Sequence, residues 1–229
     1  MIFQDEFVEG RFIERPNRFL SLVRVDGREE YAHLPNPGRI RELLFPGAPV
    51  VLRKESNPKR KTGYTLIMVY KDGILVSLNT TLPNSLAAEA IEAGKIEEFK
   101  GYGIVRREVK YKNSRFDILL SKGGTLCFLE VKSVTLVKDG TAMFPDAPTL
   151  RGTRHIHHLM EAMNEGYEAA ILFVVQREDA DRFTTNDDTD PEFASALRRS
   201  QKYGVRIHAY NCRISIGEAE IYQPVDIIL

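Results

Sequence analysis

Asp117, Glu130 and Lys132 interrupt an otherwise apolar stretch over residues 114–134. Gly123-Gly124 divides this stretch into two runs typical of β-strands, and it suits a two-residue hairpin turn because both central positions of such turns require tolerance of positive φ. Across a two-residue turn the facing positions keep a constant sum of residue numbers. The turn therefore predicts that Asp117 and Glu130 are direct cross-strand neighbours.

Two carboxylates facing each other at about 5 Å repel, more strongly when they are partly buried. A divalent cation removes this repulsion, and Mg²⁺ takes one or two carboxylates and fills the rest of its shell with water and phosphate oxygens. Lys132 shares a face with Glu130, because side chains alternate along a strand. The set predicts a phosphodiester site. A solvated sheet end, where Lys132 merely neutralises one acid, would give the same spacing.

The composition is that of a globular protein: 43% of the 229 residues are hydrophobic, which is enough for a substantial core. A formal net charge of +0 excludes a highly basic, chromatin-like binder. No apolar run approaches the roughly 20 residues of a membrane span, and no leader pattern is evident, so we expect a cytoplasmic protein. We expect Cys127 and Cys212 to be reduced packing residues.

Residues 1–82 contain six short β-like runs, separated by turn signals such as Asp26-Gly27 and Asp72-Gly73. A short helical candidate over residues 38–44 lies between the third and fourth runs. This order predicts an OB-like β-barrel, a fold whose loops often bind oligonucleotides or oligosaccharides.

Residues 83–229 read as a second domain with the order αβββαβ, which makes the protein α+β overall. The helices are expected from Pro83, over residues 150–165, and from Pro191 with Asp190 as its N-cap, ending at Gly204. Residues 138–149, rich in proline and glycine, are expected to form a loop.

An αβββαβ core whose second strand offers an Asp and whose third offers Glu-x-Lys resembles the PD-(D/E)XK nuclease superfamily. Phe116 stands where that motif has proline. The strings "AHLPNPGRIREL", "NTTLPN", "SRFDILL", "LEVKSVTL", "FPDAPTLRGTRH" and "FVVQRED" resemble the sugar fermentation stimulation protein family (SfsA) over essentially the whole chain. This resemblance implies a nuclease-like domain behind an OB-like domain, DNA binding, and a regulatory role in sugar (maltose) metabolism.

The superfamily motif also implies roles. Asp117, Glu130 and the Val131 carbonyl would bind Mg²⁺ or Mn²⁺, and Lys132 would orient or deprotonate the attacking water. Glu89, on the first helix of this domain, is a candidate fourth acid, although it also reads as a surface glutamate. Gln176, at the end of an apolar strand, is a weaker candidate.

Two groups of basic residues are candidates for binding nucleic-acid phosphates. The helix over residues 150–165 carries one group on a single face, and an ordinary polar face would look the same. The other group lies on a candidate barrel loop and a tight turn, where a solvated charge run is the alternative. The two groups are Arg151, Arg154, His155 and His158, and Arg39, Arg53, Lys54, Lys59, Arg60 and Lys61.

The leading hypothesis is a metal-dependent nuclease in which residues 1–82 hold the nucleic acid and residues 83–229 cleave it; the family resemblance implies that this nucleic acid is DNA. The alternative is a non-enzymatic DNA-binding regulator on a nuclease scaffold, for which no helix-turn-helix or other base-reading motif is present. An oligosaccharide binder is disfavoured, because the chain has no Trp and no aromatic platform is evident in the sequence.

Overall fold

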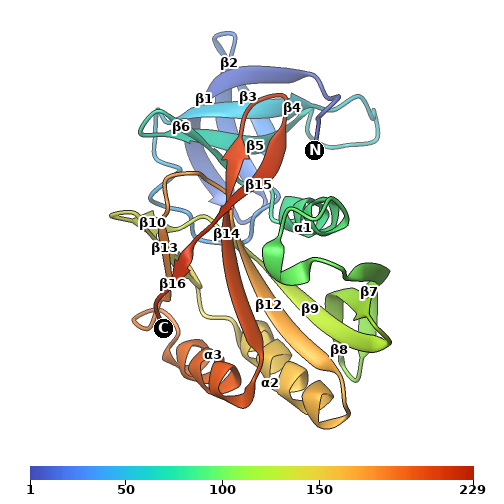
Figure 1. Cartoon of the computed structure of the whole chain (residues 1–229). Helices are drawn as coiled ribbons and strands as arrows, with labels where there is room; N and C mark the ends of the chain where they lie inside the picture. The colour runs from blue at the N-terminus through green and yellow to red at the C-terminus, as the bar shows by residue number, and fades with distance from the viewer.

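The computed structural model describes residues 1–229 and consists of a β-barrel above a larger mixed α/β body (Figure 1). The barrel strands run in the order β3-β2-β1-β4-β5-β6, and a parallel pairing of β3 with β5 closes the barrel. Their bounds are β1 Phe7–Asn17, β2 Leu20–Val25, β3 Arg28–His33, β4 Pro49–Lys54, β5 Tyr64–Lys71 and β6 Ile74–Ser77. The closed barrel with its own apolar core confirms the predicted OB-like fold.

The helix predicted over residues 38–44 is wrong, because only a turn over residues 41–43 forms there. Ile40 has φ 41°, a left-handed conformation that cannot continue a right-handed helix. The backbone N–H groups of Leu43 and Leu44 both donate to the Ile40 carbonyl, closing a single turn. Burial of Ile40 and Leu43 in the barrel core compensates for the strained backbone.

The body is built on a six-stranded sheet of order β15-β14-β12-β9-β8-β7. Its strands are β7 Gly103–Tyr111, β8 Ser114–Lys122, β9 Thr125–Val134, β12 Glu168–Val175, β14 Arg206–Ile214 and β15 Ala219–Pro224. Its helices are α1 Leu82–Glu92, α2 Leu150–Asn164 and α3 Pro191–Tyr203, with a 3-10 turn η1 at Glu97–Phe99. The order α1-β7-β8-β9-α2-β12 confirms the predicted αβββαβ core.

The two faces of this sheet bury separate apolar cores. One core joins α1 to one face, and the other joins α2 and α3 to the opposite face. Helix α3 forms as predicted: Asp190 caps its first turn by accepting from Phe193 N–H at 3.0 Å, and Gly204 ends it with φ 110°. Cys127 and Cys212 are buried and unpaired, as expected.

The loop predicted over residues 138–149 is wrong in part, because it carries strands of a second, four-stranded sheet. That sheet has the order β10-β11-β13-β16, with bounds β10 Val137–Lys138, β11 Thr141–Phe144, β13 Arg182–Thr185 and β16 Asp226–Ile227. Strand β11 forms because it pairs in parallel with β13. The sequence near β11 does not indicate this pairing, because β13 is distant in the chain.

Backbone contacts join the barrel to the body. Ser77 N–H at the end of β6 donates to the Gln176 carbonyl at 3.1 Å, and Arg39 N–H donates to Asp146 Oδ2 at 2.9 Å. None of the helices is both long enough and apolar enough to cross a membrane.

Candidate active site

The site lies where strands β8 and β9 separate. Their pairing runs from Lys122↔Thr125 to Ile118↔Leu129, in the register that the glycine turn predicts, and it ends there. Asp117 instead accepts the Val131 N–H at Oδ2, at 2.8 Å. The expectation of a regular cross-strand pair between Asp117 and Glu130 is therefore corrected: Asp117 reaches the backbone of β9.

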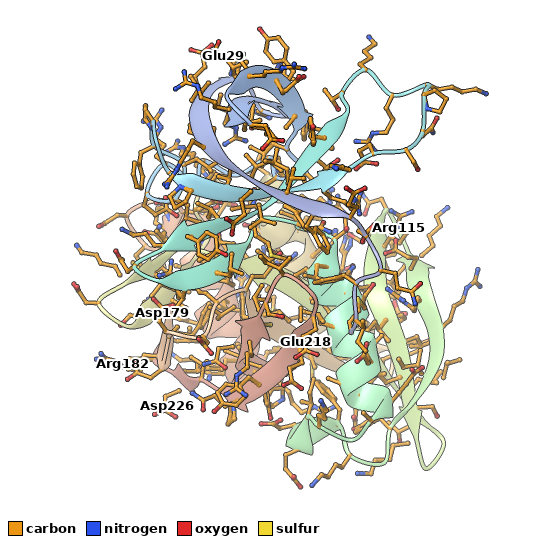
Figure 2. All side chains as sticks on the ribbon, turned by 90° about the horizontal axis from the view of Figure 1, so that it is seen from above. Glu29, Arg115, Asp179, Arg182, Glu218 and Asp226 are labelled. Carbon is orange, nitrogen blue, oxygen red and sulfur yellow. The ribbon has the colours of Figure 1, made fainter.

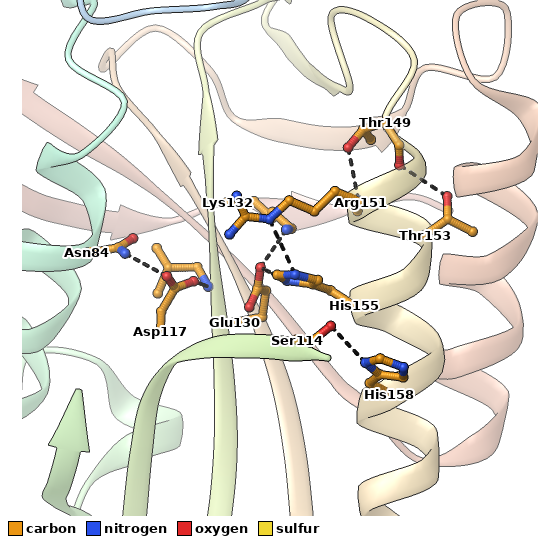
Figure 3. Close-up of polar contacts among 12 residues, drawn as sticks. Asn84, Ser114, Asp117, Glu130, Lys132, Thr149, Arg151, Thr153, His155 and His158 are labelled. Carbon is orange, nitrogen blue, oxygen red and sulfur yellow. Dashed lines mark hydrogen bonds and ion pairs between the residues drawn. The ribbon is translucent and has the colours of Figure 1, made fainter. Parts of the chain in front are cut away.

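A change of face in β8 explains this contact. Residues two apart in a regular strand share a face, yet Phe116 packs in the α2-side core and Ile118 in the α1-side core. Asp117 lies between them, at the point where the strand turns over. Its carboxylate is thereby directed toward helix α1, where Asn84 Nδ2 donates to Oδ1 at 2.7 Å (Figure 3).

Glu130 is only 4% exposed and is bound through a single oxygen. Lys132 Nζ and His155 Nδ1 each lie 2.6 Å from Glu130 Oε1, and the side chain of Lys132 shares a face with Glu130 as predicted (Figure 3). The second oxygen, Oε2, is buried and has no hydrogen-bond partner. A buried, unpartnered carboxylate oxygen is costly, which makes it the clearest sign that a ligand belongs here.

The surroundings shift the pKa values of Asp117 and Glu130 in opposite directions. Burial, reinforced by the nearby charge of Glu130, raises the pKa of Asp117 to about 6. Burial alone would also raise the pKa of Glu130, but the charge of Lys132 and the bond from His155 outweigh it and lower that pKa. Glu130 is thus the more acidic member, and Asp117 is an acid whose ionisation is opposed by its surroundings.

Helix α2 brings His155 to Glu130. Thr149 caps the helix by accepting from Gly152 N–H at 3.0 Å, and Ile156 and Leu159 pack in the apolar core between α2 and the sheet. Arg151 Nε donates to His155 Nε2 at 3.4 Å, so Nδ1 carries the proton that His155 donates to Glu130.

The four residues of the predicted cationic face of α2 therefore do not lie on one exposed surface. Arg151 and Arg154 are exposed, whereas His155 and His158 are buried. His158 Nδ1 contacts Ser114 Oγ at 2.7 Å, and burial lowers the pKa of His158. The two histidines have different partners, so they do not form a joint site.

A polar cavity of about 440 Å³ opens beside His155. Arg151 and Arg154 of α2 line it, together with Lys110, Lys112 and Arg115 at the β7–β8 turn. Figure 2 shows Arg115 beside this hairpin, on the other side of the molecule from Asp179 and Asp226. The cavity has no acidic lining residue and suits a phosphate-bearing ligand.

Two of the predicted site residues lie elsewhere. Glu89 is on the exposed side of α1, where its side chain is 52% exposed and Oε1 pairs with the Met1 amino group at 2.8 Å. Asn84, near the start of the same helix, is the residue that reaches Asp117. Gln176 is fully buried and donates to Ser133 Oγ at 2.9 Å. Ser133 follows Lys132 in β9 and therefore points to the opposite face of the sheet from Glu130 and Lys132.

Five basic residues were predicted to share one barrel loop, but Arg53 and Lys54 instead end strand β4, and only Lys59, Arg60 and Lys61 lie on the β4–β5 loop. Lys59 and Lys61 form no ion pair. Arg53 pairs with Glu55 at 2.9 Å, Lys54 pairs with Glu6, and Arg60 lies 3.4 Å from Glu55. The net positive charge that this loop offers to a ligand therefore comes mainly from Lys59 and Lys61.

Arg39 lies at the seam between barrel and body. It lines a cavity of about 670 Å³ together with Arg15, Arg18 and Arg41, and neither Asp117 nor Glu130 lines this cavity. Gly38 is required beside it, because a Cβ at this position would lie 2.3 Å from Asp146 Oδ2.

The donors near Glu130 suit a hard divalent cation. Asp117 and the unpartnered Oε2 of Glu130 supply carboxylate oxygens. The Val131 carbonyl points to the same side of β9 as its N–H, toward Asp117, beyond the last pair of the β8–β9 ladder. No group of three or more acidic, histidine or cysteine side chains is placed to hold a metal. Two carboxylates without further protein ligands match Mg²⁺, which usually keeps several waters, better than a cation that needs a closed protein cage.

Reasoning from the sequence missed two contacts, those of Asn84 with Asp117 and of His155 with Glu130. His155 precedes Leu159 by four residues and follows Gly152 by three, so it falls on the buried stripe of α2 by periodicity. That position was a usable signal. The sequence around Asn84 gives no such signal, because the contact of Asn84 with Asp117 depends on how α1 packs against the sheet.

Comparisons with known proteins cover both parts of the chain. The family described as "SfsA N-terminal OB domain" matches residues 13–78, and "Sugar fermentation stimulation protein RE domain" matches residues 81–218. The sugar fermentation stimulation protein homolog of Caldanaerobacter subterraneus subsp. tengcongensis is 42% identical over 229 residues, and that of Acetivibrio thermocellus is 45% identical over 232 residues, each alignment covering 100% of both chains. The structure of Pyrococcus furiosus SfsA in complex with Ca²⁺ aligns over 100% of both chains with a TM-score of 0.91 and 29% identity.

Proposed function

This chain belongs to the sugar fermentation stimulation protein family, and from that premise we propose that it is a divalent-metal-dependent phosphodiesterase acting on DNA. In this proposal the barrel of residues 1–82 holds the nucleic acid, and residues 83–229 carry the cleavage site. Mg²⁺ or Mn²⁺ is the proposed cofactor. The Ca²⁺ named for the Pyrococcus furiosus relative supports a divalent cation in this fold.

The observation that carries the proposal is the unpartnered Oε2 of Glu130 beside Asp117. The protein buries two neighbouring carboxyl groups, neutralises one through a single oxygen, and leaves the other with a pKa raised to about 6. A purely structural cluster gains nothing from this arrangement, since removing one carboxyl would relieve the repulsion.

Asp117, Glu130 and the Val131 carbonyl are the groups that would hold the cation. When bound, it would neutralise charge on the phosphate and acidify a coordinated water. Lys132 would orient the attacking water; to receive the proton of that water, Nζ would first have to release the proton that it donates to Glu130. In this proposal His155 holds Glu130, Asn84 holds Asp117, and neither contacts the cation, so both are positioning residues that fix the carboxylates. Arg151 and Arg154 would bind flanking phosphates.

The test is cleavage of labelled single-stranded, double-stranded and branched DNA and RNA with Mg²⁺, Mn²⁺ or EDTA. We expect metal-dependent cleavage by the wild type and none by Asp117→Asn, which keeps the side-chain shape. Cleavage that persists in EDTA, or that is equal in both proteins, would contradict the proposal.

One observation favours a second candidate, a DNA-binding regulator without catalysis. Glu130 already has Lys132 and His155 as counter-charge and donor, and the expected fourth acid, Glu89, lies away from the site. A site with only two carboxylates is what a nuclease scaffold would retain after losing catalytic activity. Tight DNA binding without cleavage under any metal would select this candidate.

A further inference from the structure

A stacked pair of rings lies on the barrel, outside the candidate active site. Phe19, in the two-residue connection between β1 and β2, is 51% exposed. Its ring stacks on His33 of β3, with ring centroids 6.5 Å apart and planes inclined by 21°. The outward part of the Phe19 ring has no other aromatic partner, so it offers a free π-face.

The backbone holds Phe19 firmly. Its N–H donates to Asn17 Oδ1 at 2.9 Å, and its carbonyl accepts from Leu34 N–H at 2.9 Å and from His33 Nδ1 at 3.1 Å. Because its backbone N–H and carbonyl are both bonded and its ring stacks on His33, Phe19 loses little conformational freedom when a ligand stacks on it. The exposed ring is therefore preorganised for stacking.

Cations surround this ring. Phe19 and His33 line a cavity of about 400 Å³ together with Arg60 and Lys61 from the β4–β5 loop, and no acidic residue lines it. Lys61 has no ion-pair partner, and Arg60 is shared with Glu55 and Thr65. A π-face beside an unpaired lysine and an arginine only partly engaged by Glu55 matches a nucleobase attached to a phosphate backbone. An oligosaccharide would give the cations no charged group to bind.

We propose that Phe19 and His33 form a stacking platform for a base of single-stranded nucleic acid, with Arg60 and Lys61 binding the adjoining phosphates. A base in a duplex is already stacked on both sides, so only an unpaired base can lie on Phe19. The inference rests on the proposed function and narrows its substrate class: the nucleic acid contains a single-stranded segment, which the barrel holds.

Binding of fluorescein-labelled oligo(dT) and of a duplex of the same length, in EDTA, tests the platform without cleavage. Phe19→Ala should weaken oligo(dT) binding about 5- to 100-fold, the range for loss of one stacked base, and change duplex binding less than about 2-fold. Phe19→Trp should restore it. The slope of log affinity against log salt should not change in Phe19→Ala, whereas Lys61→Ala should make it shallower by about 0.7.

Phe45→Ala is the matched control, because Phe45 is also a barrel phenylalanine, is 45% exposed and stacks on no other ring. It should leave oligo(dT) affinity unchanged. Equal losses on both probes, or no loss on either, would overturn the platform and leave the metal site unaffected. The platform would also be overturned if the protein bound a glucan oligosaccharide and Phe19→Ala abolished that binding while leaving oligo(dT) binding intact. A wild type that binds no nucleic acid would overturn both proposals.

Discussion

His155 of helix α2 and Glu130 of strand β9 are joined by a contact of 2.6 Å between Nδ1 and Oε1. This bond, with that of Lys132 to the same oxygen, fixes the carboxylate so that Oε2 is left without a partner. The geometry of the candidate metal site therefore depends on how α2 docks against the sheet.

Replacing His155 should lower the affinity of the protein for a divalent cation. His155→Ala frees Glu130 to rotate, and we expect affinity for Mn²⁺ to fall by about 10- to 100-fold, as for other groups that orient a metal ligand. Titration calorimetry measures this. His158→Ala is the control, because His158 is also buried on α2 but contacts Ser114. Equal losses of Mn²⁺ affinity in both variants would show that His155 acts only through packing.

Asp117→Asn should stabilise the metal-free protein at neutral pH. The pKa of Asp117 is raised from 3.8 to about 6, so the folded state binds this proton more tightly than the unfolded state. The ionised group therefore costs stability above about pH 6, and the cost fades as the pH falls toward 4. At pH 7.5 we expect a gain of about 1–3 kcal/mol in the free energy of unfolding.

Urea unfolding in EDTA at several pH values checks this gain, which should shrink steadily below about pH 6. Adding Mn²⁺ should then raise the thermal midpoint of the wild type and not that of Asp117→Asn, because only a ligand of the native state stabilises it. An equal midpoint shift in both proteins would remove Asp117 from the metal site.

Part of this site was predictable because it is encoded locally. A two-residue glycine turn leaves no freedom in register, so the pairing of Leu119 with Phe128 follows from the sequence. The break at Asp117 does not follow, because it depends on Phe116 turning toward His155, whose ring lies 5.9 Å away. That contact joins two elements far apart in the chain.

The same distinction holds for the fold. Helix α3 was predictable because Asp190, Pro191 and Gly204 mark its ends within the segment itself. The turn at Ile40 was not, since its side chain is buried in a barrel whose closure is a long-range event. Strand β11 likewise depends on a partner about 40 residues further along the chain.

Lys132 should be separable from metal binding. Lys132→Met removes a positive charge from Glu130, so Mn²⁺ affinity should be retained or increased, while cleavage should fall by about 10²- to 10⁴-fold if Lys132 handles the proton of the water. Lys132→Arg keeps the charge but cannot give up a proton, so it distinguishes the two roles. Full cleavage by Lys132→Arg would show that Lys132 supplies charge only.

The barrel loop should bind phosphates through its unpaired lysines. Replacing Lys59 and Lys61 together with Ala should weaken binding of single-stranded DNA and make the slope of log affinity against log salt shallower by about 1.4. Replacing Arg53 and Lys54 should change the slope little, because Glu55 and Glu6 already pair with them. Anisotropy titrations over a salt series measure both. Similar slopes in the two double variants would show that ion pairing with Glu55 and Glu6 does not determine which basic residues bind DNA phosphates.

Helix α1 offers the most direct contrast, since Asn84 and Glu89 lie on one helix and only Asn84 touches Asp117. Asn84→Ala removes a donor to the Asp117 carboxylate, which should raise the pKa of Asp117 further and lower Mn²⁺ affinity by about 10-fold. Glu89→Gln loses only an exposed ion pair with the Met1 amino group, worth at most about 1 kcal/mol, and should leave Mn²⁺ affinity unchanged. Calorimetric titration of both variants decides between them. The reverse result, with Mn²⁺ binding lost in Glu89→Gln and retained in Asn84→Ala, would mean that α1 turns to bring Glu89 to the metal, the arrangement that the sequence motif predicts.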